Sequence, residues 1–305
     1  MKVYTVGELK NDLIIFHHGA GYTAHTFLQL ISVLRKSLPN VCFAAFDMRG
    51  HGQSDQSADF GFDSLLKDVG KVIESLFSDD RNEKIDVFLI GHSLGASILA
   101  ALPDNFNHSL IKFSGLIMID IIEGKKKRKE CYNLFKSPLP LLETAINSLS
   151  RMPGIIQDIP KSFKDLKIAL KWTLSSSHSH HNPQAASTQI LGIENSLKSQ
   201  LKLNNETGFY EWITDLSLMK SFWDSWFKGL TKNFLKFPGS RLLILADTDY
   251  MDKEMIVAQM QGKFQLSIIR ESGHAIQEDK PEELAEIVNG MIQKHLKLSQ
   301  ILRNK

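Results

Sequence analysis

Cysteine is scarce in this chain of 305 residues, which contains only Cys42 and Cys131. The two cysteines are far apart in sequence and fit neither a disulfide framework nor the spacing of a structural metal site. We therefore expect a soluble intracellular protein from a reducing compartment.

The sequence also lacks a long apolar run, a strong charge bias and any visible repeat. No stretch reaches about 18 apolar residues, as a membrane-spanning helix requires, and the first residues show no secretory signal. The net charge of +2 gives no reason to expect nucleic-acid binding. We expect a cytoplasmic protein with neither a membrane nor a nucleic-acid partner. The basic run at 125–130 leaves a nuclear location open, although a solvated helix face explains that run more simply.

Short apolar runs recur along the chain with the length of buried strands. Because both faces of a parallel sheet are covered, such strands are apolar throughout and do not alternate with polar residues. Segments with helical spacing lie between them, as at 25–38 and 62–78, and a last helix opens at Pro281. This alternation predicts an α/β fold with a doubly wound, mostly parallel sheet. The predicted strands begin at or near Leu13, Cys42, Asp86, Ser114, Arg241 and Phe264.

The alternation of strands and helices breaks between about residues 125 and 230. This interval contains helical patterns, notably at 139–150 and 161–174, and no strand is predicted there. A polar segment at 175–187 reads as an exposed loop, and its "HSHH" run lacks the nearby carboxylate or cysteine that a metal site would need. We expect residues 1–305 to form a single α/β domain, with residues 125–230 inserted as a largely helical lid.

The pattern G-x-S-x-G occupies residues 91–95, between a predicted strand and a predicted helix, and places Ser93 at its centre. A nucleophile in this setting sits on a strained turn. A side chain two residues before or after it would collide with neighbouring backbone, which explains the two glycines. Ser93 is therefore the candidate nucleophile.

A serine hydroxyl needs a base to remove its proton and an acid to orient that base. His274 follows the last predicted strand and is the candidate base. Asp120 and Asp249 each end a predicted strand between the serine and the histidine, so both are candidate acids. Asp47 precedes the serine and is better explained as a loop anchor.

Acyl transfer also requires backbone N–H groups that stabilise a negatively charged oxygen. The glycines of "HHGAGY" allow the backbone to approach a substrate closely. The amides of Ala20 and Leu94 are the candidate donors for this oxyanion hole. This chemistry requires neither a metal nor another cofactor, and we expect none.

The motifs H-G-x-G, D-x-R-G-H-G, G-H-S-x-G and a late G-H resemble those of the α/β-hydrolase superfamily over nearly the whole chain. Within it, "MIDIIEG", "FWDSWFKGL", "QMQGKFQ" and "SGHAIQED" are similar to stretches of the protein phosphatase methylesterase family.

This resemblance implies a serine carboxylesterase that removes the methyl ester from the C-terminal leucine of the catalytic subunit of the type 2A serine/threonine phosphatase. It also implies that Asp120 is the acid. The alternatives are a small-molecule carboxylesterase or lipase, and a non-catalytic phosphatase-binding protein on a hydrolase scaffold. For contacts with substrate or partner we select Trp223, Trp226, Met260, Gln261 and Phe264, although the tryptophans could equally be packing residues.

Overall fold

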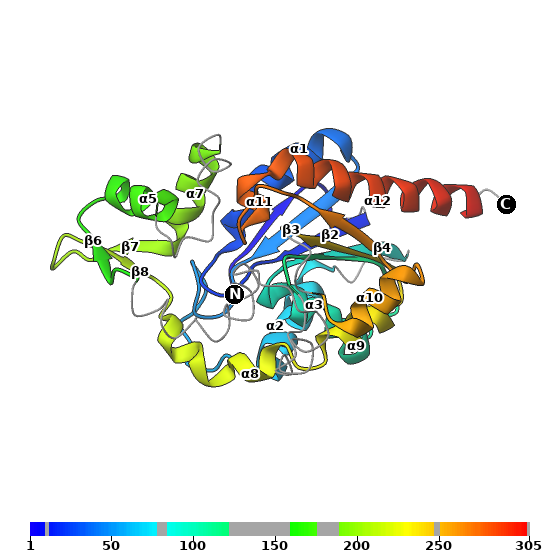
Figure 1. Ribbon diagram of the computed structural model, residues 1–305, viewed down its shortest axis with the longest axis horizontal. Coiled ribbons are helices and arrows are strands. Elements are labelled where there is room, and N and C mark those ends of the chain that lie inside the picture. The colour runs from blue at the N-terminus through cyan, green and yellow to red at the C-terminus, as the bar shows by residue number, and fades with distance from the viewer. Residues whose placement is uncertain (10–11, 78–83, 122–158, 176–188, 247–250, 304–305) are drawn as a thin grey trace, which may run out of the picture.

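The computed structural model describes residues 1–9, 12–77, 84–121, 159–175, 189–246 and 251–303. A seven-stranded sheet forms its centre, in the order β1-β3-β2-β4-β5-β9-β10 (Figure 1). β1 is antiparallel to its neighbour and the other pairs are parallel. The expected mostly parallel sheet is confirmed, with every predicted strand present. The strands are β1 (Val3–Val6), β2 (Asp12–His17), β3 (Val41–Phe46), β4 (Ile85–His92), β5 (Ile111–Ile119), β9 (Ser240–Leu245) and β10 (Gln265–Ile268).

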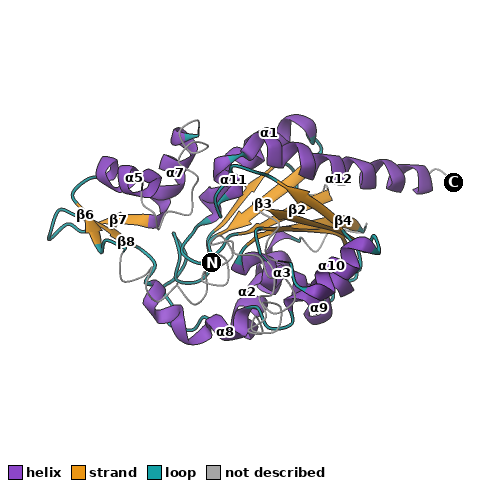
Figure 2. Ribbon diagram, viewed as in Figure 1, coloured by secondary structure: helices purple, strands orange, loops and turns teal. Residues whose placement is uncertain are grey.

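Helices cover both faces of this sheet (Figure 2). One face packs against η1 (Ala24–Phe27), α1 (Leu28–Ser37), α11 (Ile276–Asp279) and α12 (Pro281–Arg303). The other face packs against α2 (Phe62–Leu76), α3 (Leu94–Asn105), α8 (Trp223–Trp226), α9 (Leu230–Lys236) and α10 (Lys253–Met260). No helix in the described ranges combines the length and apolar character needed to cross a bilayer.

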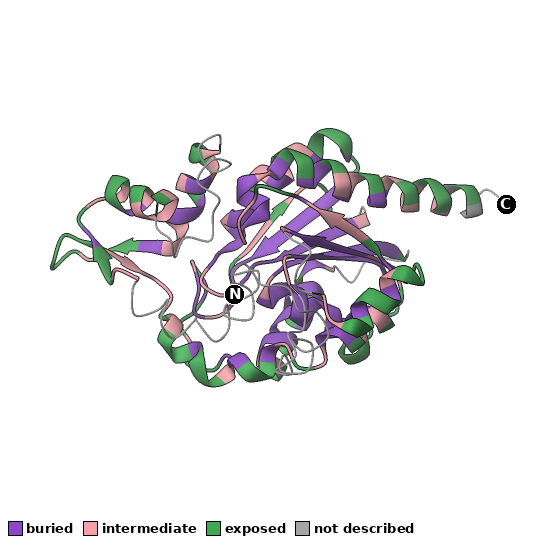
Figure 3. Ribbon diagram, in the orientation of Figure 1, coloured by how far each residue is buried: buried purple, intermediate pink, exposed green. Residues whose placement is uncertain are grey.

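β2 shows why the strands carry unbroken apolar runs. Leu13 and Ile15 belong to the hydrophobic cluster on one face of the sheet, whereas Ile14 and Phe16 belong to the cluster on the other. Successive side chains of a strand point to opposite faces, and here neither face is exposed to solvent. The central strands are accordingly buried in Figure 3.

The segment between β5 and β9 contains strands as well as helices, so the expectation of no strand between 125 and 230 is wrong. A second, three-stranded sheet has the order β6-β8-β7. Its strands contain two or three residues each, too few to produce a periodic pattern. They are β6 (Ser162–Phe163), β7 (Leu201–Leu203) and β8 (Tyr210–Trp212), and the neighbouring helices are α5 (Leu166–Ser175) and α7 (Ile190–Gln200).

We call residues 159–175 and 189–213 the lid; they lie to the left of the main sheet in Figure 1. The lid has a small hydrophobic cluster of its own, in which Phe163 contacts the indole rings of Trp172 and Trp212. The Trp212 Nε1–H donates to the Pro160 carbonyl at 2.8 Å. The predicted helix at 139–150 and most of the predicted loop at 175–187 lie outside the described residues.

The segment after the lid packs onto the main body, which corrects the partner role that we expected for two tryptophans. It comprises η3 (Leu216–Phe222), α8 and α9. Trp226 is 2% exposed, and its Nε1–H donates to the Phe60 carbonyl at 2.8 Å. Trp223 is 7% exposed and belongs to the same hydrophobic cluster. Both tryptophans are core residues, so neither offers a surface to a protein partner.

The "QMQGKFQ" stretch divides into a buried and an exposed part. Phe264 is buried against Phe234, with ring centroids 5.2 Å apart, so the expected partner role is wrong for Phe264 as well. Met260 is 79% exposed, and Gln261 is also exposed. Met260 ends α10 and Gln261 follows it, so both precede β10 and lie near the amino ends of the strands. A partner role for Met260 and Gln261 stays a prediction.

Candidate active site

Ser93 lies between the end of β4 and the first residue of α3 in a left-handed backbone conformation, with φ 50° and ψ −120°. Non-glycine residues rarely adopt this conformation, and it costs about 1–3 kcal/mol. The Ser93 N–H donates to the Ile119 carbonyl at 3.0 Å, which ties the turn to the end of β5. The residue is half-buried at the carboxyl edge of the sheet.

The glycines that flank Ser93 are required by close packing. A Cβ atom on Gly91 would overlap the backbone of Ala96, and one on Gly95 would overlap the His17 carbonyl. The expected collision is therefore confirmed at both positions. Only chains without these two Cβ atoms can bring α3 this close to β2 and β4.

Asp120 follows β5 and also has a positive φ, of 49°. Its N–H donates to the Ile244 carbonyl at 2.7 Å, and its Oδ1 accepts from the Ala246 N–H at 3.0 Å. Its Oδ2 lies 2.7 Å from His274 Nδ1. The end of β9 thus holds both the backbone and the carboxylate of Asp120.

His274 lies in the loop between β10 and α11, and neighbours hold this loop on two sides. Asp279 Oδ2 accepts from the Gly273 N–H at 2.7 Å, and His92 Nε2 donates to the His274 carbonyl at 3.0 Å. Because the ionised Asp120 can only accept, His274 Nδ1 carries the hydrogen and Nε2 presents a lone pair. The His92 and His274 rings lie 4.6 Å apart, which places the candidate base beside the residue that precedes Ser93.

The structure describes only one of the two candidate acids, Asp120 and Asp249. Asp120 contacts His274, whereas Asp249 lies outside the described residues. The choice of Asp120 stays a prediction, with its hydrogen bond to His274 as support.

The candidate oxyanion loop, Gly19 to Gly21, lies against the serine turn. A Cβ atom on Gly19 would come within 3.0 Å of Ser93 Cβ. No described residue accepts a hydrogen bond from the Ala20 N–H, and Leu94 begins α3, where N–H groups have no partner within the helix. Both amides can therefore serve a substrate oxygen.

Asp47 is buried and behaves as the loop anchor that we expected. Its Oδ1 accepts from the Ala24 N–H at 2.8 Å, and its Oδ2 accepts from the Gln53 N–H at 2.9 Å. The Tyr4 hydroxyl donates to the same carboxylate at 3.1 Å. Burial, together with the nearby Asp47 charge, raises the pKa of Tyr4 to about 12.

A buried carboxylate that the sequence analysis did not single out connects the lid to the site. Glu278 Oε1 accepts from Ser196 of α7 at 2.7 Å and from Thr26 of η1 at 2.5 Å. Glu278 lies in α11, directly after the His274 loop. The lid helix, the segment after the oxyanion loop and the segment after the base therefore meet at one side chain. The acidic residues that follow His274 in the sequence were the signal that could have drawn attention to Glu278.

Three further imidazoles are buried near the oxyanion loop: His17, His18 and His51. Burial lowers the pKa of His17 and that of His51 to about 4. Burial also lowers the pKa of His18, with the neighbouring His51 and His17 adding to the effect. All three rings are therefore neutral at neutral pH.

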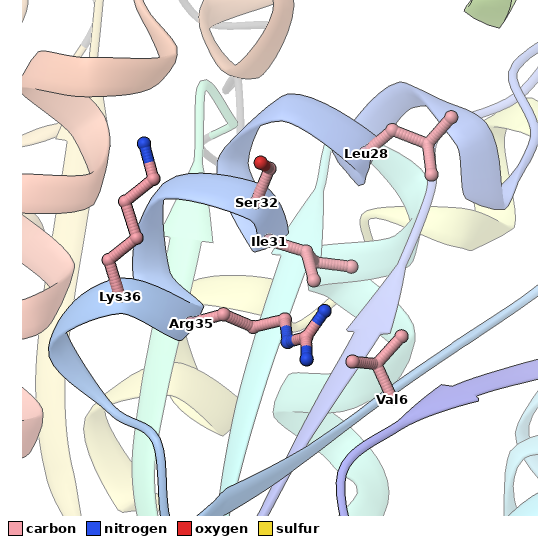
Figure 4. Close-up of a pocket in the computed structure, with 6 residues that line it drawn as sticks. All are labelled: Val6, Leu28, Ile31, Ser32, Arg35 and Lys36. Atoms are coloured by element: carbon pink, nitrogen blue, oxygen red, sulfur yellow. The ribbon is translucent and has the colours of Figure 1, made fainter.

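A surface pocket of about 460 Å³ lies elsewhere, between α1 and the edge strand β1 (Figure 4). Val6 forms part of its wall and pairs with Phe43, in the amino-terminal half of β3. The proposed catalytic residues follow the carboxyl ends of the strands, so this pocket is not their substrate site. Within the described ranges no group of three or more metal-ligating side chains occurs, and the "HSHH" run lies outside those ranges.

Comparison with known proteins agrees with this geometry. Residues 14–287 match the alpha/beta hydrolase family. The solved structure of E-2-(acetamidomethylene)succinate hydrolase superposes with a TM-score of 0.66 at 17% identity, covering 95% of this chain and 94% of that one. An esterase of M. tuberculosis gives a TM-score of 0.62 at 19% identity, covering 96% and 92%. The chain is a member of the α/β-hydrolase family.

Sequence relatives indicate which α/β hydrolases this chain is similar to in sequence. A Candida albicans protein named protein phosphatase methylesterase 1 is 34% identical to this chain, and the match covers 93% of this chain and 69% of that protein. The protein of the same name in Schizosaccharomyces pombe is 32% identical, and the match covers 93% of this chain and 75% of that protein. The chain belongs to the protein phosphatase methylesterase family. It spans 63% of the length of the Saccharomyces cerevisiae relative, to which it is 35% identical over 88% of this chain.

Replacing Gly95 with alanine should lower the free energy of unfolding by about 3 kcal/mol, since the new methyl group overlaps the His17 carbonyl and the backbone must move. Urea unfolding measures this change. Gly290→Ala is the matched control, because nothing lies within 4 Å of the added Cβ and alanine favours the helix by up to about 1 kcal/mol. Equal stability of the Gly95→Ala variant and the wild type would contradict the packing argument.

Acid should destabilise the protein between about pH 6.5 and pH 4. In this window an unfolded histidine binds a proton while His17 and His51 stay neutral in the fold, so the unfolded state binds more protons. The free energy of unfolding should therefore fall with falling pH, by on the order of 3 kcal/mol for each ring. Urea unfolding at pH 7, 6 and 5 measures the slope. His17→Asn should reduce the slope, and an unchanged slope would show that His17 is not its source.

Proposed function

We propose that this protein is a serine carboxylesterase that removes the methyl ester from the C-terminal leucine of the catalytic subunit of type 2A protein phosphatase. The hydrogen bond between Asp120 and His274, beside the strained turn of Ser93, is the observation that carries the esterase assignment. Family membership supports the choice of substrate, because the relatives are named protein phosphatase methylesterases.

In the proposed mechanism, Nε2 of the neutral His274 removes the Ser93 proton as Oγ attacks the ester carbonyl carbon. The tetrahedral intermediate collapses when protonated His274 donates that proton to the leaving methoxide, which departs as methanol. Water then attacks the acyl enzyme with His274 again as the base, and the free carboxylate and Ser93 are restored. Asp120 orients the ring and stabilises its charged form in both steps.

The negative charge on the tetrahedral oxygen is stabilised by the amides of Ala20 and Leu94. The positive end of the α3 dipole points toward the same place, because Leu94 is the first residue of that helix. These groups are fixed before the substrate binds, so little reorganisation is needed during the reaction.

A methyl group offers little area for recognition, so we propose that specificity comes from the peptide tail and the body of the phosphatase. The lid is well placed for this contact, since Ser196 anchors α7 beside the His274 loop through Glu278. Leu191 on α7 and Leu203 on β7 are exposed apolar residues of the lid.

Ser93→Ala should reduce methanol release from carboxymethylated phosphatase by at least about a thousandfold, because the attacking oxygen is lost. Thermal unfolding of the variant should match that of the wild type. Parallel assays with short acyl esters distinguish the alternatives: a general esterase would favour those esters and ignore the phosphatase. Phosphatase binding without hydrolysis by the wild type would indicate a non-catalytic partner.

Asp120→Asn should reduce kcat by about 10⁴-fold, because an amide can donate to Nδ1 and thereby stabilise the wrong tautomer of His274. Asp249→Asn should change kcat less than about tenfold, because in this proposal Asp120, and not Asp249, orients the His274 ring. Steady-state kinetics of both variants makes the comparison. The opposite ranking would transfer the role of the acid to Asp249.

A further inference from the structure

Two of the buried imidazoles connect the oxyanion loop to the turn that follows β3. His18 Nδ1 lies 2.8 Å from the Gly19 carbonyl oxygen, and its Nε2 accepts from the Met48 N–H at 2.9 Å. His51 Nδ1 lies 2.9 Å from the Arg49 carbonyl oxygen, and its Nε2 accepts from the Gly21 N–H at 3.0 Å. The two rings are 5.1 Å apart and fully buried.

These contacts fix the tautomer of each ring. A nitrogen that accepts from a backbone N–H carries no hydrogen, so Nε2 is the acceptor in both rings and Nδ1 is the donor. Each ring thus joins one backbone donor to one backbone acceptor. Protonation would destroy the Nε2 acceptor, and burial disfavours the charged form of either ring.

The groups that the rings hold are the two peptide units on either side of Ala20. The Gly19 carbonyl and the Ala20 N–H belong to one planar unit and point in opposite directions, so a donor at the carbonyl sets the direction of the N–H. The Tyr22 N–H also donates to this carbonyl, at 3.2 Å. The Gly21 N–H belongs to the next unit, and Gly21 has a φ of +82°, which makes its conformation depend on such contacts.

We propose that His18 and His51 are positioning residues for ester hydrolysis, which hold the Ala20 N–H in the direction of the developing oxyanion. A hydrogen bond to the Gly19 carbonyl also polarises the peptide and strengthens its N–H as a donor. Leu94 is held in a comparable way, because the Ser93 carbonyl of its peptide unit accepts from the Ala96 N–H at 3.0 Å. This inference rests on the proposed esterase function.

A crossed pair of substitutions tests the proposal. An asparagine amide occupies the place of histidine Nδ1, whereas a glutamine amide reaches the place of Nε2. At position 18 the contact with the loop is made by Nδ1, so His18→Asn should keep it and His18→Gln should lose it. At position 51 the contact is made by Nε2, so His51→Gln should keep it and His51→Asn should lose it.

The variants that lose the loop contact should show kcat reduced by about tenfold to a hundredfold with KM within about twofold, using carboxymethylated phosphatase as the substrate. The variants that keep it should stay within about threefold of the wild-type kcat. His108→Gln, at a half-buried imidazole beside Phe77 and Phe106, is the control and should change neither parameter.

A purely structural role predicts a different result. In that case the kcat of the four variants would rise and fall with their thermal stability, and the same amide, asparagine or glutamine, would give the higher kcat at both positions. That result, or unchanged kcat in all four variants, would overturn the proposal. Long-range ¹H–¹⁵N NMR of the wild type provides a test that does not depend on the folding of variants. Both rings should be in the Nδ1–H form, and an Nε2–H form at either position would also overturn the proposal.

The proposed function has a separate test in the same samples. A fluorophosphonate should label Ser93 of the wild type. If the wild type is neither labelled nor able to hydrolyse any ester, the esterase function fails and the positioning role fails with it. An active, labelled wild type whose variants show the wrong ranking overturns the positioning role alone.

Discussion

The close approach of α3 to β2 and β4 is the constraint on which the site depends. Gly91 and Gly95 lie in backbone contact with Ala96 and His17, so the chain must turn within one residue. That residue is Ser93, and its left-handed conformation is maintained by the surrounding packing rather than by its own preference. The same approach brings the first N–H groups of α3 next to the oxyanion loop.

The order of the sheet then brings together residues that are distant in sequence. Asp120 and His274 are 154 positions apart, yet they follow β5 and β10, the two strands on either side of β9 in the sheet. Hydrogen bonds beyond the ends of the strands continue the ladder: the Ser93 N–H to Ile119, and the Asp120 N–H to Ile244. The carboxyl ends of the parallel strands thus form a rigid edge that positions the candidate site residues.

The parts of this arrangement that could be predicted are those with a strong local signal. Buried parallel strands are apolar throughout, and the turn at Ser93 needs glycine at both sides, so the sheet and the candidate nucleophile could be predicted from the sequence. β1 was missed because "VYTV" is a short, half-buried edge strand. Trp223 is buried by tertiary packing against the main body, and the contacts of Glu278 join segments far apart in sequence. Neither the burial of Trp223 nor the contacts of Glu278 produce a local sequence pattern.

The histidines show most clearly why residue type alone does not define a role. His274 is 30% exposed, and its Nδ1 contacts the Asp120 carboxylate, as the proposed proton-transfer role requires. His18 and His51 are fully buried and contact backbone groups, which favours a permanently neutral ring with one donor and one acceptor. Proton transfer and rigid support require opposite environments. The fold supplies both environments, because His274 lies in a partly exposed loop whereas His18 and His51 are buried against the candidate oxyanion loop.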